Sequence, residues 1–174
     1  MDNRSEQNQP TQFELREELE QFLFYEARCI DEKCWDDWLS LYLEEAIYWI
    51  PTDRDQLDPL QQASIVYEDK ATLRLRVQRM THPQAHSLER RPESTHLISN
   101  VMLDEVVDND YVAYHVSSSF IALGYQEDLR NTQTVYGGRY FHQLVRQDKQ
   151  LKIKQKKSIL NNCDAAHRNI QILL

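Results

Sequence analysis

The sequence predicts an α+β fold in which a curved antiparallel sheet wraps around N-terminal helices. Apolar residues in the first half of the chain recur at helical spacing, whereas from Ser94 onward the chain forms long runs with the two-residue period of strands. A chain of 174 residues with 41% hydrophobic composition suits one domain with a substantial core. We therefore expect a loose polar tail over residues 1–12 and a single domain over residues 13–174.

Three helices are expected before residue 94. Residues 13–33 open the first helix, residues 34–43 form the second, and residues 69–80 return to helical spacing. The apolar positions expected to face the core are Leu15, Leu19, Phe22, Leu23 and Ala27 in the first helix, Trp35, Trp38, Leu39 and Tyr42 in the second, and Leu73, Val77 and Met80 in the third. The tryptophans are expected to anchor the core.

Strands account for the remaining periodic segments. Residues 44–51 predict a strand stopped by Pro51, and residues 52–62 a polar connection. Four long strands joined as hairpins follow, over residues 94–107, 111–125, 132–147 and 151–161. In the second of these, one face is apolar and the other carries His115, Ser117 and Ser119. Gly137 and Gly138 inside the third predict a bulge or a sharp bend.

Charge is distributed unevenly along the chain. Residues 1–58 hold 16 Asp and Glu against 5 Lys and Arg, a balance of −11, whereas residues 137–160 hold seven basic residues against one acidic, a balance of +6. The net charge of −8 argues against a nucleic-acid partner, because such proteins present a basic field to the phosphates. The basic hairpin carries Lys or Arg on both apparent faces, which suggests contacts between subunits.

The expected cellular compartment of the protein follows from features that the sequence lacks. It has no run of about 18 apolar residues, and its first dozen residues lack the apolar stretch of a signal peptide. Cys29, Cys34 and Cys163 are an odd number without the density of a disulfide scaffold, which agrees with free thiols in a reducing compartment. We expect a cytoplasmic protein that does not contact membranes.

Metal and nucleophile motifs are weak. His82, His86 and Glu89 supply two histidines and a carboxylate, the ligand set of mononuclear iron, but they fall in a loop interrupted by proline. No cysteine has a histidine at the offsets of a Rieske iron–sulfur cluster. Cys163 and His167 lack a third orienting group. We therefore assign no catalytic, cofactor-binding or metal-binding residue to this chain.

An acid–base pair inside a hollow sheet is the alternative. His96 and His115 lie on neighbouring predicted strands, and Asp31 lies at the end of the first helix. Together they would supply the proton transfers of a dehydratase or isomerase that works alone. A histidine on a strand is more often a structural residue or part of a subunit contact.

Four ordered blocks carry a family resemblance over nearly the whole chain. They are LEQFLFYEARCIDEKCWDDWLSLYLEEAIYWIP, SIVYEDKATLRLRVQRM, RRPESTHLISNV and GGRYFHQLVRQDKQLKIKQKKSIL. In order and spacing they resemble the small (β) subunit of aromatic-ring-hydroxylating dioxygenases. The third block departs from the Arg-rich form of many hydrocarbon-oxidising members, and only His96, Ile98, Ser99 and Asn100 fit it. The substrate is therefore left open.

The resemblance implies a fold, a function and partners. The fold would be the cystatin-like cone that scytalone dehydratase and ketosteroid isomerase share. The chain would be a non-catalytic subunit that stabilises an α subunit, and this α subunit would carry the Rieske [2Fe–2S] cluster and the mononuclear Fe(II) for O2-dependent cis-dihydroxylation. Three α and three β chains would form a hexamer, which a reductase or ferredoxin supplies with electrons.

The subunit contacts expected from this resemblance involve five residues. They are His96, Asn100, Arg139, Arg146 and Lys156. The basic members would pair with carboxylates of an adjacent chain, with the acidic first helix as one source. The alternative for the basic hairpin is a solvated face.

Overall fold

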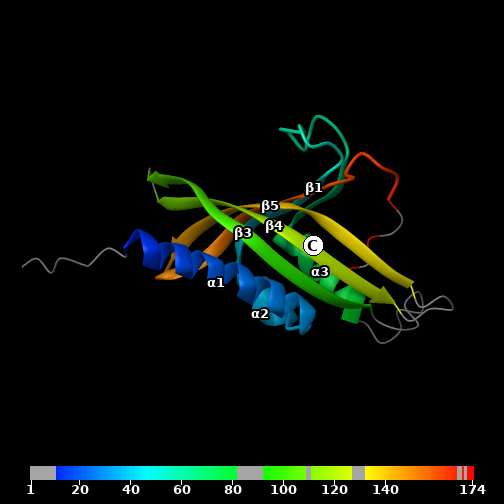
Figure 1. Ribbon diagram of the computed structural model, residues 1–174, viewed down its shortest axis with the longest axis horizontal. Coiled ribbons are helices and arrows are strands. Elements are labelled where there is room, and N and C mark those ends of the chain that lie inside the picture. Colours follow the sequence, from blue (N-terminus) through cyan, green and yellow to red (C-terminus); the bar gives the residue numbers. More distant parts are fainter. Residues whose placement is uncertain (1–10, 82–91, 109–110, 127–131, 168–169, 171) are drawn as a thin grey trace, which may run out of the picture.

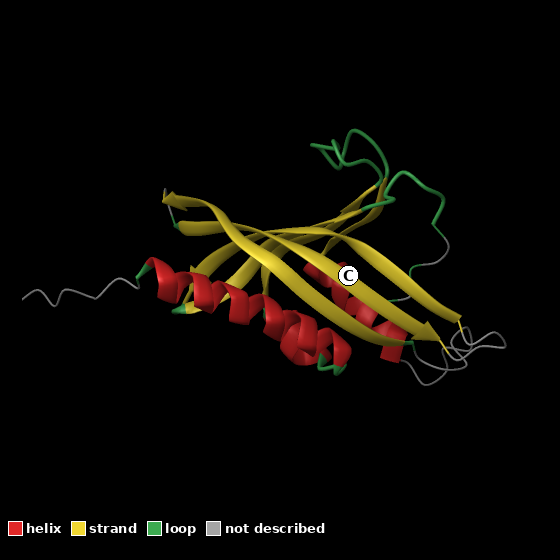
Figure 2. Cartoon of the chain, in the orientation of Figure 1, coloured by secondary structure: helices red, strands yellow, loops and turns green. Residues whose placement is uncertain are grey.

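The computed structural model describes residues 11–81, 92–108, 111–126, 132–167, 170 and 172–174. The described elements are the helices α1 (Gln12–Asp31), α2 (Trp35–Ser40) and α3 (Lys70–Thr81), and the strands β1 (Tyr42–Pro51), β2 (Ser64–Asp69), β3 (Glu93–Asp108), β4 (Val112–Gln126), β5 (Thr132–Gln147) and β6 (Gln150–Leu160). The helices gather on one side of a curved, twisted sheet (Figures 1 and 2). We call the sheet face toward the helices the inner face, and the opposite face the outer face.

The strand order in the sheet is β2-β1-β6-β5-β4-β3. Strands β3 to β6 form the expected antiparallel meander. Two features differ from expectation: β2 was not predicted, and β1 pairs with β6 in parallel. The sheet is therefore mixed rather than purely antiparallel, because the chain reaches β1 from α2 and lays it beside the last strand.

Helix α1 begins at a capping box. The Thr11 hydroxyl accepts from the Glu14 backbone N–H, and the Glu14 carboxylate accepts from the Thr11 N–H at 2.8 Å. Thr11 and Gln12 thus belong to the ordered start of the helix, while the other residues expected in the tail lie outside the described part. The predicted apolar stripe is confirmed, since Leu19 and Leu23 are buried.

Helix α2 is shorter than expected. It ends at Ser40, and the Leu41 carbonyl already accepts a sheet hydrogen bond of 2.7 Å from the Ile153 N–H. Tyr42 is consequently a strand residue, and its ring meets that of Trp38 edge-on at 5.0 Å. The expected anchoring role holds for Trp38, which is fully buried, whereas Trp35 only borders the core.

A bulge in β6 explains why basic residues alternate irregularly along the hairpin. Gln143 pairs with Gln155 and Leu144 with Ile153, so β6 has one extra residue, Lys154, at this point. The extra residue reverses the inward and outward alternation. Leu151 and Ile153 face inward before it, and Lys156, Ser158 and Leu160 face inward after it.

The tight turn between β5 and β6 has two residues. Asp148 and Lys149 both have positive φ, 50° and 67°, as in a type I′ turn. The turn matches the right-handed twist of the two strands.

Of the bulge or sharp bend predicted at Gly137 and Gly138, the bulge is wrong. Pairing continues without a shift from Phe120–Gly138 to Ile121–Gly137. A Cβ added at Gly138 would lie 2.0 Å from the Ile159 carbonyl oxygen, whereas one at Gly137 would meet no atom closer than 3.5 Å. Gly138 is needed because the backbone of β6 approaches it closely.

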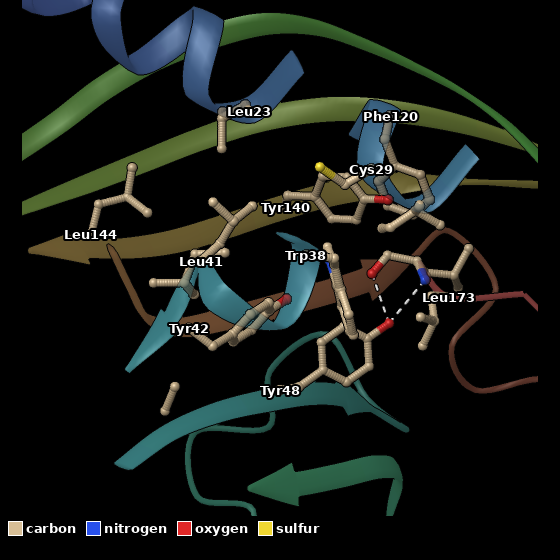
Figure 3. Close-up of a cluster of buried hydrophobic side chains, with 14 of the residues drawn as sticks. Leu23, Cys29, Trp38, Leu41, Tyr42, Tyr48, Phe120, Tyr140, Leu144 and Leu173 are labelled. Carbon is tan, nitrogen blue, oxygen red and sulfur yellow. Dashed lines mark hydrogen bonds between the residues drawn. The ribbon is translucent and has the colours of Figure 1, made fainter. Parts of the chain in front are cut away.

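The core fills the space between the inner face and the helices. Leu23 and Cys29 from α1, and Trp38 from α2, lie toward Tyr48, Phe120 and Tyr140 on the strands (Figure 3). The rings of Phe120 and Tyr140 stack at 4.0 Å with an interplanar angle of 3°. The concave side of the sheet is thus lined by large aromatic side chains.

Candidate functional site

A buried polar cluster centred on Glu26 lies between α1 and the inner face. One carboxylate oxygen, Oε1, accepts from Lys156 Nζ at 2.8 Å, from the Tyr42 hydroxyl at 3.1 Å and from Trp38 Nε1 at 3.4 Å. The other oxygen, Oε2, lies 3.1 Å from His142 Nε2. The side chains of Glu26, His142 and Lys156 are at most 3% exposed. The cluster therefore joins α1, α2, β1, β5 and β6.

Electrostatics keep Glu26 ionised. Burial alone would raise the pKa of this carboxyl group, but the Lys156 ammonium and the hydrogen bond from His142 together hold it well below its ordinary value. Burial lowers the pKa of His142, so the imidazole is neutral at pH 7. An ionised carboxylate can only accept, so Nε2 carries the proton of His142 and donates it. Glu26 is thus a buried anion that accepts hydrogen bonds from four donors. This arrangement suits a structural role that holds the helices against the sheet.

The sequence contains a signal for this cluster that we did not use. Glu26 falls on the apolar stripe of α1, since it lies three residues after Leu23 and seven after Leu19. A charge on the buried stripe demands a buried partner. The partner, Lys156, was hidden because the Lys154 bulge shifts the alternation of β6.

Lys156 corrects one expectation. It was predicted to pair with a carboxylate of an adjacent chain. Instead its side chain is buried in the core, 1% exposed, and pairs with Glu26 of the same chain. Arg146 likewise has a partner in its own α1, because its guanidinium donates to both carboxylate oxygens of Glu18, at 2.8 and 2.7 Å. The acidic first helix does supply carboxylates, but here they belong to the same chain.

Asp31 and His96 are brought together. The Asp31 carboxylate accepts from the His96 backbone N–H at 2.8 Å, from His96 Nδ1 at 2.7 Å and from the Ser94 hydroxyl at 2.8 Å. Burial raises the pKa of Asp31, but these hydrogen bonds outweigh it and keep the pKa below its ordinary value. The pair fastens the end of α1 to β3.

His115 does not join that pair. His96 lies opposite Ala122 and faces inward, while His115 lies opposite Gln143 on the outer face. There it borders a hollow of about 270 Å³ with Asp104, Glu105 and Phe141. The sheet separates the two histidines, so the acid–base arrangement expected of a stand-alone dehydratase or isomerase is not formed.

Arg139 and Asn100 are the expected contact residues that the chain leaves exposed. Arg139 lies on the outer face, with its guanidinium 5.0 Å from the centre of the Phe141 ring. Asn100 has a φ of 51° at a bulge in β3, where pairing shifts between Ser99 and Met102. The Asn100 amide donates to the Ser119 hydroxyl at 3.4 Å, and Arg139 and Asn100 both remain exposed to solvent.

The outer face carries exposed apolar side chains beside Arg139. Leu97 and Ile121 lie directly opposite each other on β3 and β4 and are 59% and 47% exposed. Val135 on β5 is 64% exposed and Met102 on β3 is 56% exposed. We call Leu97, Met102, Ile121 and Val135 the outer patch. Clustered exposed apolar residues of this kind mark protein contact surfaces.

The residues that the structure describes do not form an iron site. Within the described segments, no group of three or more His, Cys, Asp and Glu side chains could hold a metal ion. Cys29, Cys34 and Cys163 are free thiols, and Cys29 and Cys163 are buried. His82, His86 and Glu89, the weak candidate set, lie outside the described residues. Cys163 is a buried free thiol, and His167 Nε2 has no hydrogen-bond partner among the described residues. No step of a reaction is therefore assigned to a metal held by the described residues.

Fold and site together define a class of protein. It is an α+β cone whose interior is filled by packed aromatic residues and a structural ion pair, and whose outer face bears an apolar patch. No helix in the described part of the chain is long and apolar enough to span a bilayer.

Comparison with known proteins identifies the family. The family model described as the ring hydroxylating beta subunit matches residues 25–165, so the chain belongs to this family. It is 31% identical over 156 residues to the small subunit of 2-halobenzoate 1,2-dioxygenase from Burkholderia cepacia. The aligned region covers 87% of this chain and 90% of that subunit. The resemblance predicted from the four sequence blocks is confirmed.

Solved structures agree with the fold. The beta subunit of benzoate 1,2-dioxygenase from Burkholderia mallei superimposes with a TM-score of 0.68 at 25% identity, over 89% of this chain and 95% of that one. A scytalone dehydratase-like protein from Novosphingobium aromaticivorans shares the fold, with a TM-score of 0.57 at 17% identity over 83% of both chains. The predicted cone is therefore confirmed.

Proposed function

We propose that this chain is the non-catalytic β subunit of an aromatic-ring-hydroxylating dioxygenase. It stabilises a separate α subunit, which holds a Rieske [2Fe–2S] cluster and a mononuclear Fe(II) for O2-dependent cis-dihydroxylation of an aromatic ring. The complex contains three α and three β chains, receives electrons from a reductase or ferredoxin, and works in the cytoplasm. Membership of the β subunit family supports this assignment.

One structural observation carries the proposal: none of the described helices covers the outer face, which bears the outer patch (Figure 2). Two buried carboxylates on the helix side of the sheet are committed to internal contacts, with Glu26 bonded to Lys156 and Asp31 to His96. The outer face remains as a surface with exposed apolar and basic groups. An adjoining subunit would remove this apolar area from water, which favours association.

Arg139 is the proposed charged contact at this surface. It is exposed and lies on the same face as the outer patch. A carboxylate of the neighbouring chain would pair with it and help to fix the orientation of the two subunits. Asn100 is proposed as a second contact, because it is exposed at the bulge in β3.

Co-expression with an α chain tests the proposal. The partner is taken from the reading frame beside the gene for this chain, provided that it encodes Cys-x-His and Cys-x-x-His. We expect a stable complex in which iron and sulfide accompany the α chain, while this chain alone binds no stoichiometric iron. A chain that purifies apart from this partner, or that binds one iron per chain alone, contradicts the proposal.

A further inference from the structure

Residues 172–174 lie on the helix side of the sheet and reach across several strands. The Tyr48 hydroxyl on β1 donates to the Leu174 carbonyl at 2.7 Å and accepts from the Leu174 N–H at 2.9 Å (Figure 3). On β3, His96 Nε2 lies 3.0 Å from the Leu173 carbonyl oxygen. Ile172 lies near Gly124 on β4, where an added Cβ would be 3.4 Å from the Ile172 side chain. The three residues therefore close the cone between strands that are distant in the sheet.

The side chains beneath this segment are aromatic. Leu173 and Leu174 are at most 2% exposed. Figure 3 shows Leu173 beside Tyr48 and Trp38, with Phe120 and Tyr140 on the strands above. Trp38 and Tyr48 meet edge-on at 6.4 Å. Planar walls of this kind suit a flat ring, because aromatic pairs gain from stacking and edge contacts beyond the area that they bury.

Polar atoms in the same interior are available to a ligand. The Tyr140 hydroxyl is buried and has no hydrogen-bond partner among the described residues. The Tyr48 hydroxyl is bonded to the backbone of Leu174 and His96 Nε2 lies against the Leu173 carbonyl oxygen, so both atoms would become accessible if this segment moved away. A buried hydroxyl without a partner lowers stability, and a hydrogen bond to a ligand oxygen would recover this loss.

We propose that the cone interior is a binding site for a small phenol-like aromatic molecule, with residues 172–174 as its stopper. The ligand ring takes the place of the leucine side chains between the aromatic walls. The ligand hydroxyl forms a hydrogen bond with the Tyr140 hydroxyl. Tyr48 or His96 forms a second hydrogen bond with the same ligand hydroxyl. Binding requires displacement of the stopper, so the unaltered chain binds such molecules weakly. This site is separate from the proposed contact surface on the outer face.

Calorimetric titration with phenol and with benzene tests the site. We compare the unaltered chain with a variant that ends at residue 171, and with that variant carrying Tyr140→Phe. Phenol is expected to bind the shortened chain at least about tenfold more tightly than the unaltered chain. Tyr140→Phe should weaken phenol binding up to about tenfold, as one hydrogen bond allows, and leave benzene binding unchanged.

The controls separate a built site from a simple hole. Leu57→Ala removes an apolar side chain that is 91% exposed, and it should leave phenol binding as in the unaltered chain. If circular dichroism shows that the shortened chain is unfolded, Leu174→Ala replaces it, and phenol should then raise the melting temperature of this variant more than that of the unaltered chain. A folded variant that fails to bind phenol overturns the proposal. The proposal is also overturned if phenol and benzene bind with equal affinity and Tyr140→Phe changes neither affinity, because a dry apolar cavity behaves in this way.

Discussion

Glu26 Oε1 and Lys156 Nζ lie 2.8 Å apart in the closed interior of the cone and join α1 to β6. These groups are 130 residues apart in the chain, and each is at most 3% exposed. A buried ion pair of this kind adds little net stability relative to an apolar pair, but the loss of one partner strands the other charge. The first predictions follow from this asymmetry.

Lys156→Met should destabilise the chain by about 3–5 kcal/mol, because the Glu26 carboxylate loses its counter-ion in a buried site. Urea unfolding measures the change. Adding Glu26→Gln should restore a large part of the loss, since the amide oxygen still accepts from Tyr42 and no buried charge remains. Lys149→Met, at the exposed turn, is the control and should have little effect. A double variant no more stable than Lys156→Met would contradict the ion-pair explanation.

Acid should destabilise the chain through Glu26. Its folded-state pKa is lowered, so below the ordinary Glu pKa of about 4.3 the unfolded chain binds a proton that the folded chain does not. The stabilisation is therefore present above about pH 5 and is lost as the pH falls toward the lowered folded-state value. Urea unfolding between about pH 3.5 and 7 measures it.

Glu26→Gln should flatten this pH dependence, because the amide does not titrate. Glu17→Gln, on the exposed side of the same helix, should leave the slope as in the unaltered chain. Equal slopes in the unaltered chain and in Glu26→Gln would show that other groups govern acid sensitivity.

The Arg146–Glu18 pair should matter far less. Its side chains are 28% and 40% exposed, and partly solvated pairs contribute at most about 1 kcal/mol. Glu18→Gln is expected to lower the free energy of unfolding by less than about 1 kcal/mol, and added salt should reduce the difference. A loss comparable to that of Lys156→Met would mean that the pair is buried, for instance by another chain.

Gly138→Ala should destabilise the chain by at least about 1–3 kcal/mol, because the new methyl group would overlap the Ile159 carbonyl. Gly137→Ala is the matched control, since its methyl group meets ordinary contact distances. Thermal unfolding of the two variants compares them directly. Equal melting temperatures would show that β6 moves aside at little cost.

Much of the fold could be predicted from local patterns. The stripe of α1 and the alternation of β4 each depend on the period of one element, and both appear as expected. Strand β2 and the parallel pairing of β1 with β6 could not be predicted in this way. A six-residue strand has little period to detect, and the pairing depends on where the chain returns after a long excursion.

The site was harder to predict than the fold. Lys156 was expected at a subunit surface because the hairpin shows lysines on both apparent faces. The Lys154 bulge is the cause of that appearance, and a one-residue shift in register exchanges the faces of all later side chains. Glu26, by contrast, interrupted an apolar stripe and could have been recognised from the sequence.

Sedimentation velocity of this chain mixed with the α chain encoded beside it tests the central claim most directly. The account predicts one boundary with the mass of three α and three β chains. It also predicts that Arg139→Glu on the outer face shifts this boundary toward separate subunits at low concentration, whereas the control Lys149→Glu does not. Both variants should keep the unfolding curve of the unaltered chain. Two independent boundaries from the unaltered chains, at every concentration and salt, would contradict the assignment of this chain as a β subunit.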